Sequence, residues 1–288
     1  MKAITTLSSL SPEEKNFLKT KQITAANTPD GWISFFKKLK QIDTDGDKTR
    51  NRGFSFGCLG LVVAFIGIIL IGFGVGFIVI PIGILIAIGG YALYFYLKSY
   101  DIPGSILSHT LIPMLMILRE EMKPNEQIKL RLDLRGFSMP EKLLRTNPEY
   151  ARGSYHKIVD SFYKDHWMDG DTILADGTRL IWAVEDLVRS SEKNKRNNRG
   201  KHKSKTKNKH QSLISLQVGM YNKKYSLPEK IKQKTAEGAI RTKDVDKYSW
   251  MSLRKLIKHE GGQTFTPSDF INAIASAYAR AIPSGGKK

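Results

Sequence analysis

The sequence predicts an α+β protein, in which a two-helix transmembrane hairpin precedes a cytoplasmic antiparallel β-sheet domain covered by helices. The first observation is an uncharged run of 44 residues from Phe54 to Leu97. The second is a set of later segments in which apolar and polar residues alternate, as they do in half-buried strands. The third is an apolar stripe with helical spacing near the C-terminus. These observations divide the chain into an N-terminal region at 1–53, a hairpin at 54–97 and an α+β domain at 98–288.

Charge and composition narrow the classes of function. The 288-residue chain has 46 Lys and Arg against 27 Asp and Glu, which gives a formal net charge of +19. Such an excess favours polyanionic partners. A hydrophobic content of 41% is too high for a wholly disordered chain. Cys58 is the single cysteine, so an intramolecular disulfide and a cysteine-based zinc site are excluded.

The uncharged run is too long for one membrane span. As a single helix it would extend roughly 66 Å, against a hydrocarbon core of about 30 Å. Two helices near 54–73 and 78–97 fit, with a turn among the glycines and the proline of 72–81. Cationic residues flank the run and the turn has none, so the positive-inside rule predicts cytoplasmic termini. A re-entrant loop that does not cross the membrane is the alternative.

Small residues recur through both predicted spans at spacings that place them on one face of each helix. Small residues let membrane helices approach closely, either within the hairpin or between copies of the chain. The simpler interpretation is that glycine is common in membrane helices. The predicted helix-packing residues are Gly60, Ala64, Gly67, Gly83, Ala87 and Gly90.

The N-terminal region contains two helix signals. Ser11-Pro12-Glu13-Glu14 is a capping box, which predicts a short helix over 11–24. A basic amphipathic helix follows, with apolar residues at helical spacing between Trp32 and Ile42. We expect it to lie at the membrane surface or, alternatively, to pack its apolar face on the soluble domain. The predicted interface residues are Trp32, Phe35, Phe36, Lys37, Lys38 and Lys40.

Asp43-Thr44-Asp45-Gly46-Asp47 has the aspartate spacing of a calcium loop but lacks its other requirements. Lys48 occupies the position of the required glycine, and Phe54 that of the bidentate glutamate. The segment is therefore expected to be a solvated acidic turn.

The C-terminal domain combines helix and strand signals. Asp176-Gly177 between two strand-like segments predicts a tight hairpin. Thr266-Pro267-Ser268-Asp269 predicts a helix start. The stretch 226–265 gives weaker signals, with a strand or short helix at 250–257. The expected elements are a helix at 105–122 that Pro113 kinks or divides, strands at 128–134, 156–163, 167–174, 178–188 and 214–220, a loop at 138–154 and a final helix at 267–282.

A basic tract connects the last two predicted strands, which we expect to pair antiparallel. Nine of the 17 residues from 193 to 209 are cationic and none is acidic. The lysines would share one face of an extended ribbon, whereas in a disordered loop the spacing has no such meaning. The tract is expected to be a loop that binds nucleic acid, anionic headgroups or an acidic protein; the alternative is a solvated linker. Its cationic residues are Lys193, Lys195, Arg196, Arg199, Lys201, Lys203, Lys205, Lys207 and Lys209.

No sequence motif nominates a catalytic, metal or cofactor site. None of the six histidines has metal-ligand spacing, and phosphate-binding and nucleophile-elbow motifs are missing. His166, beside Asp165 and Asp169, forms the one local acid–base cluster, and a turn is the simpler interpretation. No catalytic residue, metal, cofactor or small-molecule substrate is therefore predicted.

The predicted function is that of a non-enzymatic, membrane-anchored binding or scaffold protein that presents lysines to a polyanion. The first alternative is a structural or effector subunit that forms homo-oligomers or a membrane complex through its glycine-striped helices. The second is an enzyme whose site the sequence does not reveal. Packing of the glycine stripe within one hairpin favours the first interpretation, and packing between copies favours the oligomer.

Overall fold

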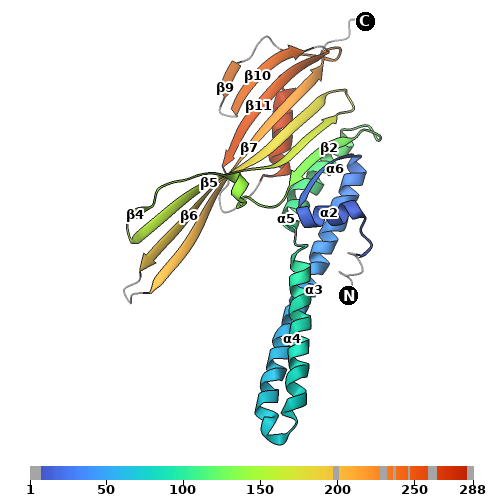
Figure 1. Ribbon diagram of the computed structural model, residues 1–288. Helices are drawn as coiled ribbons and strands as arrows, with labels where there is room; N and C mark the ends of the chain where they lie inside the picture. Colours follow the sequence, from blue (N-terminus) through green and yellow to red (C-terminus); the bar gives the residue numbers. More distant parts are fainter. Residues whose placement is uncertain are drawn as a thin grey trace. The chain divides into compact units, whose positions relative to one another are not determined.

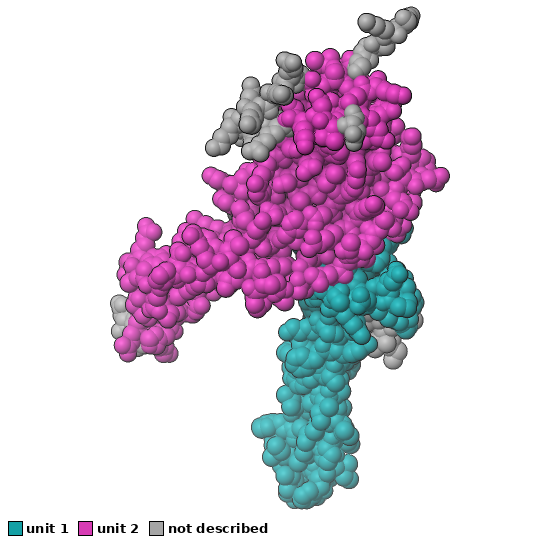
Figure 2. Space-filling model, turned by 45° about the horizontal axis from the view of Figure 1, so that its top comes forward, with its two compact units in different colours: residues 1–21, 34–108 teal, residues 22–33, 109–288 magenta. Residues whose placement is uncertain are grey.

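The computed structural model describes residues 8–196, 201–227, 232–235, 238–245, 247–258 and 265–283. The chain forms two compact units (Figures 1 and 2). Unit 1 contains residues 1–21 and 34–108, and unit 2 contains residues 22–33 and 109–288. Helices and a large antiparallel sheet together make the chain an α+β protein.

Unit 1 is built on two long helices. Helix α2 (Pro12–Thr20) begins with the predicted capping box, in which Ser11 and Glu14 each accept from the backbone N–H of the other. Helix α3 (Pro29–Ile69) continues into a 3-10 turn, η1 (Leu70–Phe73), and Gly74 then adopts the left-handed conformation before α4 (Gly76–Lys98). Both α3 and α4 are long and apolar enough to cross a membrane. The turn lies where the glycines predict it, although Pro81 is inside α4.

The predicted acidic turn at 43–47 is wrong, because α3 runs through it without interruption. Other groups of unit 1 contact the aspartates of this helical segment. Asp43 accepts from the backbone N–H of Ile102, and Arg50 forms ion pairs with Asp47 and Asp101 at 2.7 and 3.1 Å. These tertiary contacts offset the low helix propensity of aspartate and glycine.

Unit 2 contains one large antiparallel sheet. The strand order is β1-β2-β5-β6-β7-β11-β10-β9, and β3 and β4 also pair with β5. The strands are β1 (Gln22–Asn27), β2 (Ile128–Asp133), β3 (Leu143–Thr146), β4 (Tyr150–Arg152), β5 (Tyr155–Ile173), β6 (Arg179–Arg196), β7 (His202–Tyr221), β9 (Lys232–Thr235), β10 (Gly238–Val245) and β11 (Tyr248–Lys258). The strands β8 (Tyr225–Ser226) and β12 (Ile282–Pro283) form a second, two-stranded sheet.

One face of the large sheet is covered by helix α7 (Pro267–Tyr278), which Figure 1 shows behind the strands. Its capping box uses Thr266 and Asp269, as the sequence predicts. The rings of Phe270 and Trp182 meet edge to face at 5.3 Å, and both side chains are buried. Alternate residues of β6 and β7 complete this core, which explains the apolar periodicity of those segments.

The region 105–122 is largely helical, as the sequence predicts, and consists of three consecutive pieces. The segment begins with α5 (Gly104–Ile106) and a π-helical turn (Leu107–Leu111), and then continues as α6 (Ile112–Glu120). Pro113 lies in the first turn of α6, where a missing backbone N–H costs little. The helical backbone continues through all three pieces, with the π-helical turn just before the proline, so Pro113 does not divide the segment.

Several strand boundaries differ from the prediction. The segments 156–163 and 167–174 form one continuous strand, β5, with a bulge between His166 and Met168. The predicted loop at 138–154 contains a 3-10 turn, η3 (Pro140–Lys142), and the short strands β3 and β4. Residues 21–24, predicted to be helical, belong to the C-cap of α2 and to β1. The segment 250–257 is part of strand β11.

The predicted hairpin at Asp176-Gly177 is confirmed. Gly177 has a φ of +90°, a conformation that a residue without a Cβ adopts freely. The carboxylate of Asp176 accepts hydrogen bonds from the backbone N–H and the hydroxyl of Thr178 at 2.8 and 2.9 Å. The turn joins β5 to β6 and sets the register of one of the two longest strand pairs in the sheet.

Candidate functional site

Strands β4 to β7 continue beyond the body of the sheet as an arm, which projects from unit 2 in Figures 1 and 2. The arm comprises β4 and residues 155–163, 188–196 and 202–210 of β5, β6 and β7. Strand β11 pairs with β7 only from Gln211 to Tyr221. Within the described residues, 202–210 therefore form an unpaired outer edge of the sheet.

The basic tract lies in this arm, and its described residues are strand where a loop was expected. Residues 193–196 end β6, and residues 202–209 begin β7. The prediction of a loop was wrong because β6 and β7 remain paired as far as Arg196 and His202. The pairing of β6 with β7 confirms the predicted antiparallel partners.

Strand pairing brings six lysines onto one face of the arm. Residues directly opposite each other in an antiparallel pair share a face, and successive residues alternate between faces. Lys193 lies opposite Lys205, and Lys195 lies opposite Lys203. The resulting lysine face consists of Lys193, Lys195, Lys203, Lys205, Lys207 and Lys209. No ion pair of these six is found among the described residues.

The opposite face of the same two strands has a different chemistry. Between the lysines of β7 lie the neutral residues Ser204, Thr206 and Asn208, which pair with Asn194, Glu192 and Ser190 of β6. The charge is therefore sorted by face within the arm. A tract whose only role is to remain hydrated needs no such sorting.

Like charges lie directly opposite each other in two cross-strand pairs, Lys193 with Lys205 and Lys195 with Lys203. Arg189 and Lys209 form a third cationic pair on the same face. Like charges in this position destabilise a sheet by up to about 1 kcal/mol per pair. An anion bound across the two strands would remove this repulsion.

Protection of an open sheet edge explains only part of the pattern. Lysines on an edge strand discourage unwanted pairing with another chain. This accounts for the lysines of β7, which lie on the edge. It does not account for Lys193, because β6 is paired there on both sides, with Ile158 of β5 and Lys205 of β7.

Aromatic and acidic groups of β5 hold the lysine face, and the sequence analysis missed them. The ammonium groups of Lys193 and Lys195 lie 5.6 and 5.8 Å from the ring centre of Tyr155. Asp160, with 2% exposure, accepts hydrogen bonds from Arg189 at 2.6 Å and Ser191 at 2.5 Å. Contacts between β5 and β6 produce this cluster, and no local spacing in the sequence signals it.

The remaining cations of the tract do not join the lysine face. Arg196 alternates onto the opposite face, where it pairs with His202. Lys201 precedes β7, and Arg199 lies outside the described residues. The structure therefore places six of the nine predicted residues together.

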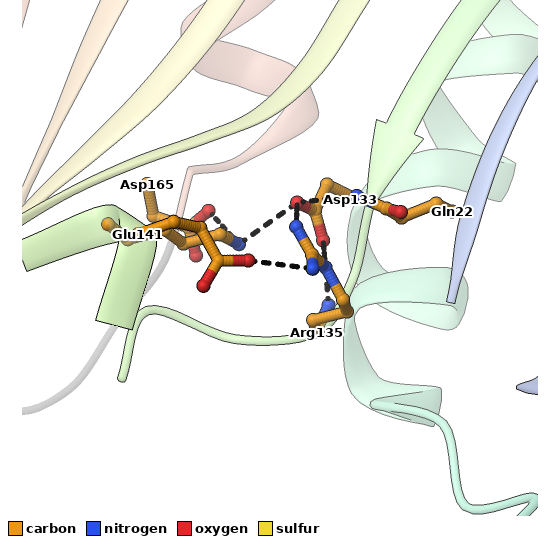
Figure 3. A network of polar contacts seen from close by, with 6 residues as sticks. Gln22, Asp133, Arg135, Glu141 and Asp165 are labelled. Carbon is orange, nitrogen blue, oxygen red and sulfur yellow. Dashed lines mark hydrogen bonds and ion pairs between the residues drawn. The ribbon is translucent and has the colours of Figure 1, made fainter. Parts of the chain in front are cut away.

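A second polar cluster lies where β2, η3 and β5 approach one another (Figure 3). Lys142, only 7% exposed, contacts Asp165 at 2.6 Å and Asp133 at 3.3 Å. Burial raises the pKa of Asp165 even though Lys142 opposes the shift. Burial also acts to raise the pKa of Asp133, but hydrogen bonds from Arg135 and the charge of Lys142 lower it overall. Each carboxylate has a cationic partner, so the cluster has the character of a structural ion-pair network.

His166 is part of strand β5, where a turn was expected. Its ring nitrogens contact Glu185 at 3.0 Å and Asp169 at 2.5 Å, and Lys164 also contacts Glu185 at 2.8 Å. Burial acts to raise the pKa of Glu185, but Lys164 and His166 lower it overall. No group of three His, Cys, Asp or Glu in the described part of the chain is arranged to hold a metal ion.

A hollow of about 410 Å³ lies on the sheet in unit 2. Its lining includes Arg131, Asp169 and Asp171 beside the apolar Ile181. Arg131 pairs with Asp169 at 3.4 Å, and Arg179 pairs with Asp171 at 2.7 Å. Because its charges are largely paired, the hollow lacks the single-sign character of the lysine face.

The predicted helix-packing residues meet one another between α3 and α4. A Cβ added at Gly83 would collide with the backbone nitrogen of Ala64, and one at Gly60 with that of Ala87. Gly90 lies equally close to Gly57, which the sequence analysis did not include. A Cβ at Gly67 would lie 2.8 Å from Ile80. The small residues thus serve contact between the two helices of one chain.

The predicted interface residues divide into buried and exposed groups. Trp32 and Phe36 are buried, and the indole of Trp32 donates to the carbonyl of Ile128 at 2.9 Å. Phe35 is half-buried, Lys38 pairs with Glu14 at 2.9 Å, and Lys37 and Lys40 are exposed. Most apolar side chains of the stripe are therefore buried within the protein.

Comparison of the chain with protein-family models, curated proteins and solved structures found no match. The lysine face and the two apolar helices therefore carry the evidence for function.

Proposed function

We propose that the protein is a non-enzymatic membrane anchor with cytoplasmic termini, and that its lysine face binds a polyanion. The single observation that carries the proposal is the sorting of six lysines onto one face, including two pairs that directly oppose each other. Isolated, this arrangement is electrostatically unfavourable. A polyanion supplies the opposite charge, and a folded strand pair presents the lysines in fixed rows.

The two apolar helices are evidence for the proposed membrane anchor. Their apolar windows are mostly exposed, unlike those of core helices in a soluble protein. Large exposed apolar side chains include Phe65, Ile69, Phe73, Phe77 and Leu85. Cationic residues before the first helix and Lys98 after the second favour a hairpin whose two ends are cytoplasmic.

Helix packing favours an anchor over an oligomer-forming effector. The small-residue stripe is occupied by contact between α3 and α4 of the same chain. A stripe consumed in this way is not available for the same close contact between copies. The anchor therefore requires no second subunit.

Inorganic polyphosphate is a suitable probe, because it offers dense negative charge without bases or acyl chains. We expect the full chain in neutral detergent to bind it, more weakly as salt screens the charges. The combined substitutions K203Q, K205Q, K207Q and K209Q should abolish most of the binding. A control with K123Q, K223Q, K224Q and K258Q removes the same charge from exposed positions off the arm. Equal loss in the two variants would reject the lysine face as the site.

A further inference from the structure

We infer that the polyanion at the lysine face is the phosphate backbone of a nucleic-acid double helix, bound without readout of its bases. This inference rests on the proposed function and specifies its partner. DNA and RNA duplexes share the phosphodiester chemistry in question. An anionic membrane and an acidic protein are the competing partners.

The surroundings of the lysines are hydrophilic, which favours a nucleic acid over a membrane. Surfaces that bind membranes combine cations with apolar or aromatic side chains that enter the acyl boundary. No large apolar side chain is exposed at 188–196 or 202–210, the described segments that carry the lysine face. The residues between its lysines on β7 are serine, threonine and asparagine.

Two aromatic rings of the arm, those of Tyr155 and Phe162, already have cationic partners, which favours a duplex over a single strand. Single-stranded nucleic acids gain much of their affinity by stacking bases on open aromatic rings. Lys193 and Lys195 lie over Tyr155, and Arg145 lies 4.7 Å from the ring centre of Phe162. A double helix keeps its bases stacked internally and presents only phosphates and groove edges.

The dimensions of the lysine face suit contact with several phosphates. Lysines at alternate positions of a strand are about 6.7 Å apart, and neighbouring strands are about 4.8 Å apart. The row from Lys203 to Lys209 therefore extends roughly 20 Å. Double-stranded DNA carries one charge per about 1.7 Å of its axis, so six lysines find partners within that length.

The chemistry of lysine explains why base readout is not expected. An ammonium group is a strongly hydrated point charge on a flexible stem, whereas arginine offers the planar fork that reads guanine. On this face of β6 and β7 within the arm, Arg189 is held by its ion pair with Asp160, and the six other cations of the described residues are lysines. Affinity should therefore depend on salt and on helix length, with little dependence on sequence.

The test uses the full chain in nanodiscs of neutral lipid, titrated with DNA duplexes of two unrelated sequences and an RNA duplex. If six phosphates are neutralised, each duplex should bind with a slope of log affinity against log salt of about −5. Between about 50 and 200 mM salt, the affinity should fall roughly 1,000-fold. The substitutions K203Q, K205Q and K207Q should flatten the slope by about 3, because three contacts are lost. A control with K123Q, K223Q and K224Q should leave the slope unchanged.

Phosphatidylserine vesicles, an acidic peptide and inorganic polyphosphate separate the outcomes. Binding of polyphosphate and of vesicles or peptide, without the duplexes, would overturn the nucleic-acid inference and leave the proposed function standing. Binding of none of these probes at low salt would reject the proposed function as well. A tenfold preference between the two DNA sequences would contradict recognition through the backbone alone.

Discussion

Within the arm, the buried carboxylate of Asp160 on β5 organises groups from the two neighbouring strands. Tyr150 of β4 and Arg189 and Ser191 of β6 all donate hydrogen bonds to it. Burial acts to raise the pKa of Asp160, but these donors lower it overall. Because the folded-state pKa lies below the unfolded value of about 3.9, Asp160 stabilises the fold above that pH. The stabilisation is lost as the pH falls through the folded-state pKa.

Asp160→Asn should therefore destabilise the protein at neutral pH, by about 1–3 kcal/mol, since Arg189 loses its charged partner. The melting temperatures of wild type and variant, measured in detergent from pH 7 downward, should converge below about pH 4. A difference that stays constant down to acid pH would show that the Asp160 charge is not the stabilising group.

Lys142 offers a second test at the residue scale. Removal of one partner from a buried ion pair leaves an uncompensated charge, which costs about 3–5 kcal/mol. Lys142→Met should incur a loss of that size at neutral pH, because the buried Asp165 loses its cationic partner, whereas Asp133 keeps Arg135. The double variant K142M/D165L should recover part of the lost stability. Denaturant unfolding measures the free energy of unfolding of each variant. Equal stability of Lys142→Met and wild type would contradict the network of Figure 3.

At the scale of elements, the helix packing of α3 against α4 depends on specific glycines. A Cβ at Gly83 or Gly90 would strike backbone atoms of α3, whereas one at neighbouring Gly89 would meet nothing within 4 Å. Gly83→Ala and Gly90→Ala should each lower the thermal stability in detergent, by about 1 kcal/mol or more. Gly89→Ala is the matched control and should be neutral or stabilising, because alanine favours helices. The same loss at Gly89 would indicate a general effect of glycine replacement.

Local signals predicted the elements that depend on local chemistry. The capping boxes at Ser11 and Thr266 and the Asp176-Gly177 turn appear where expected, since each acts within a few residues. The alternating segments became strands because one face of each is buried. These features were sufficient to derive the fold class.

Long-range pairing explains what the sequence did not reveal. Strand β1 has little apolar alternation and forms by pairing with β2, 100 residues or more away in sequence. Helix α3 crosses its acidic segment because the backbone N–H of Ile102 and the side chain of Arg50 supply partners for Asp43 and Asp47. The lysine spacing on β7 hinted at a shared face, but the opposition of Lys193 to Lys205 depends on the register of β6 and β7.

At the scale of the whole molecule, the anchor predicts a defined topology. With Cys58 replaced by alanine, single cysteines at Ser9, Gly72 and Ala279 mark the two end regions and the turn between α3 and α4. Gly72 is suitable because a Cβ there meets nothing within 4 Å. An impermeant thiol reagent should label only Gly72→Cys in intact cells. Labelling of Ser9→Cys or Ala279→Cys would contradict the cytoplasmic termini.

The central claim is that the lysine face, and not the net charge, binds the polyanion. Exchange of neighbours in K203S/S204K/K205T/T206K/K207N/N208K keeps the composition and moves three lysines to the opposite face. The polyphosphate affinity of this variant, measured across a salt series beside wild type, is the most direct test. Its salt dependence should fall to about half, since three of the six lysines remain on the face. Affinity and salt dependence equal to those of wild type would contradict the account.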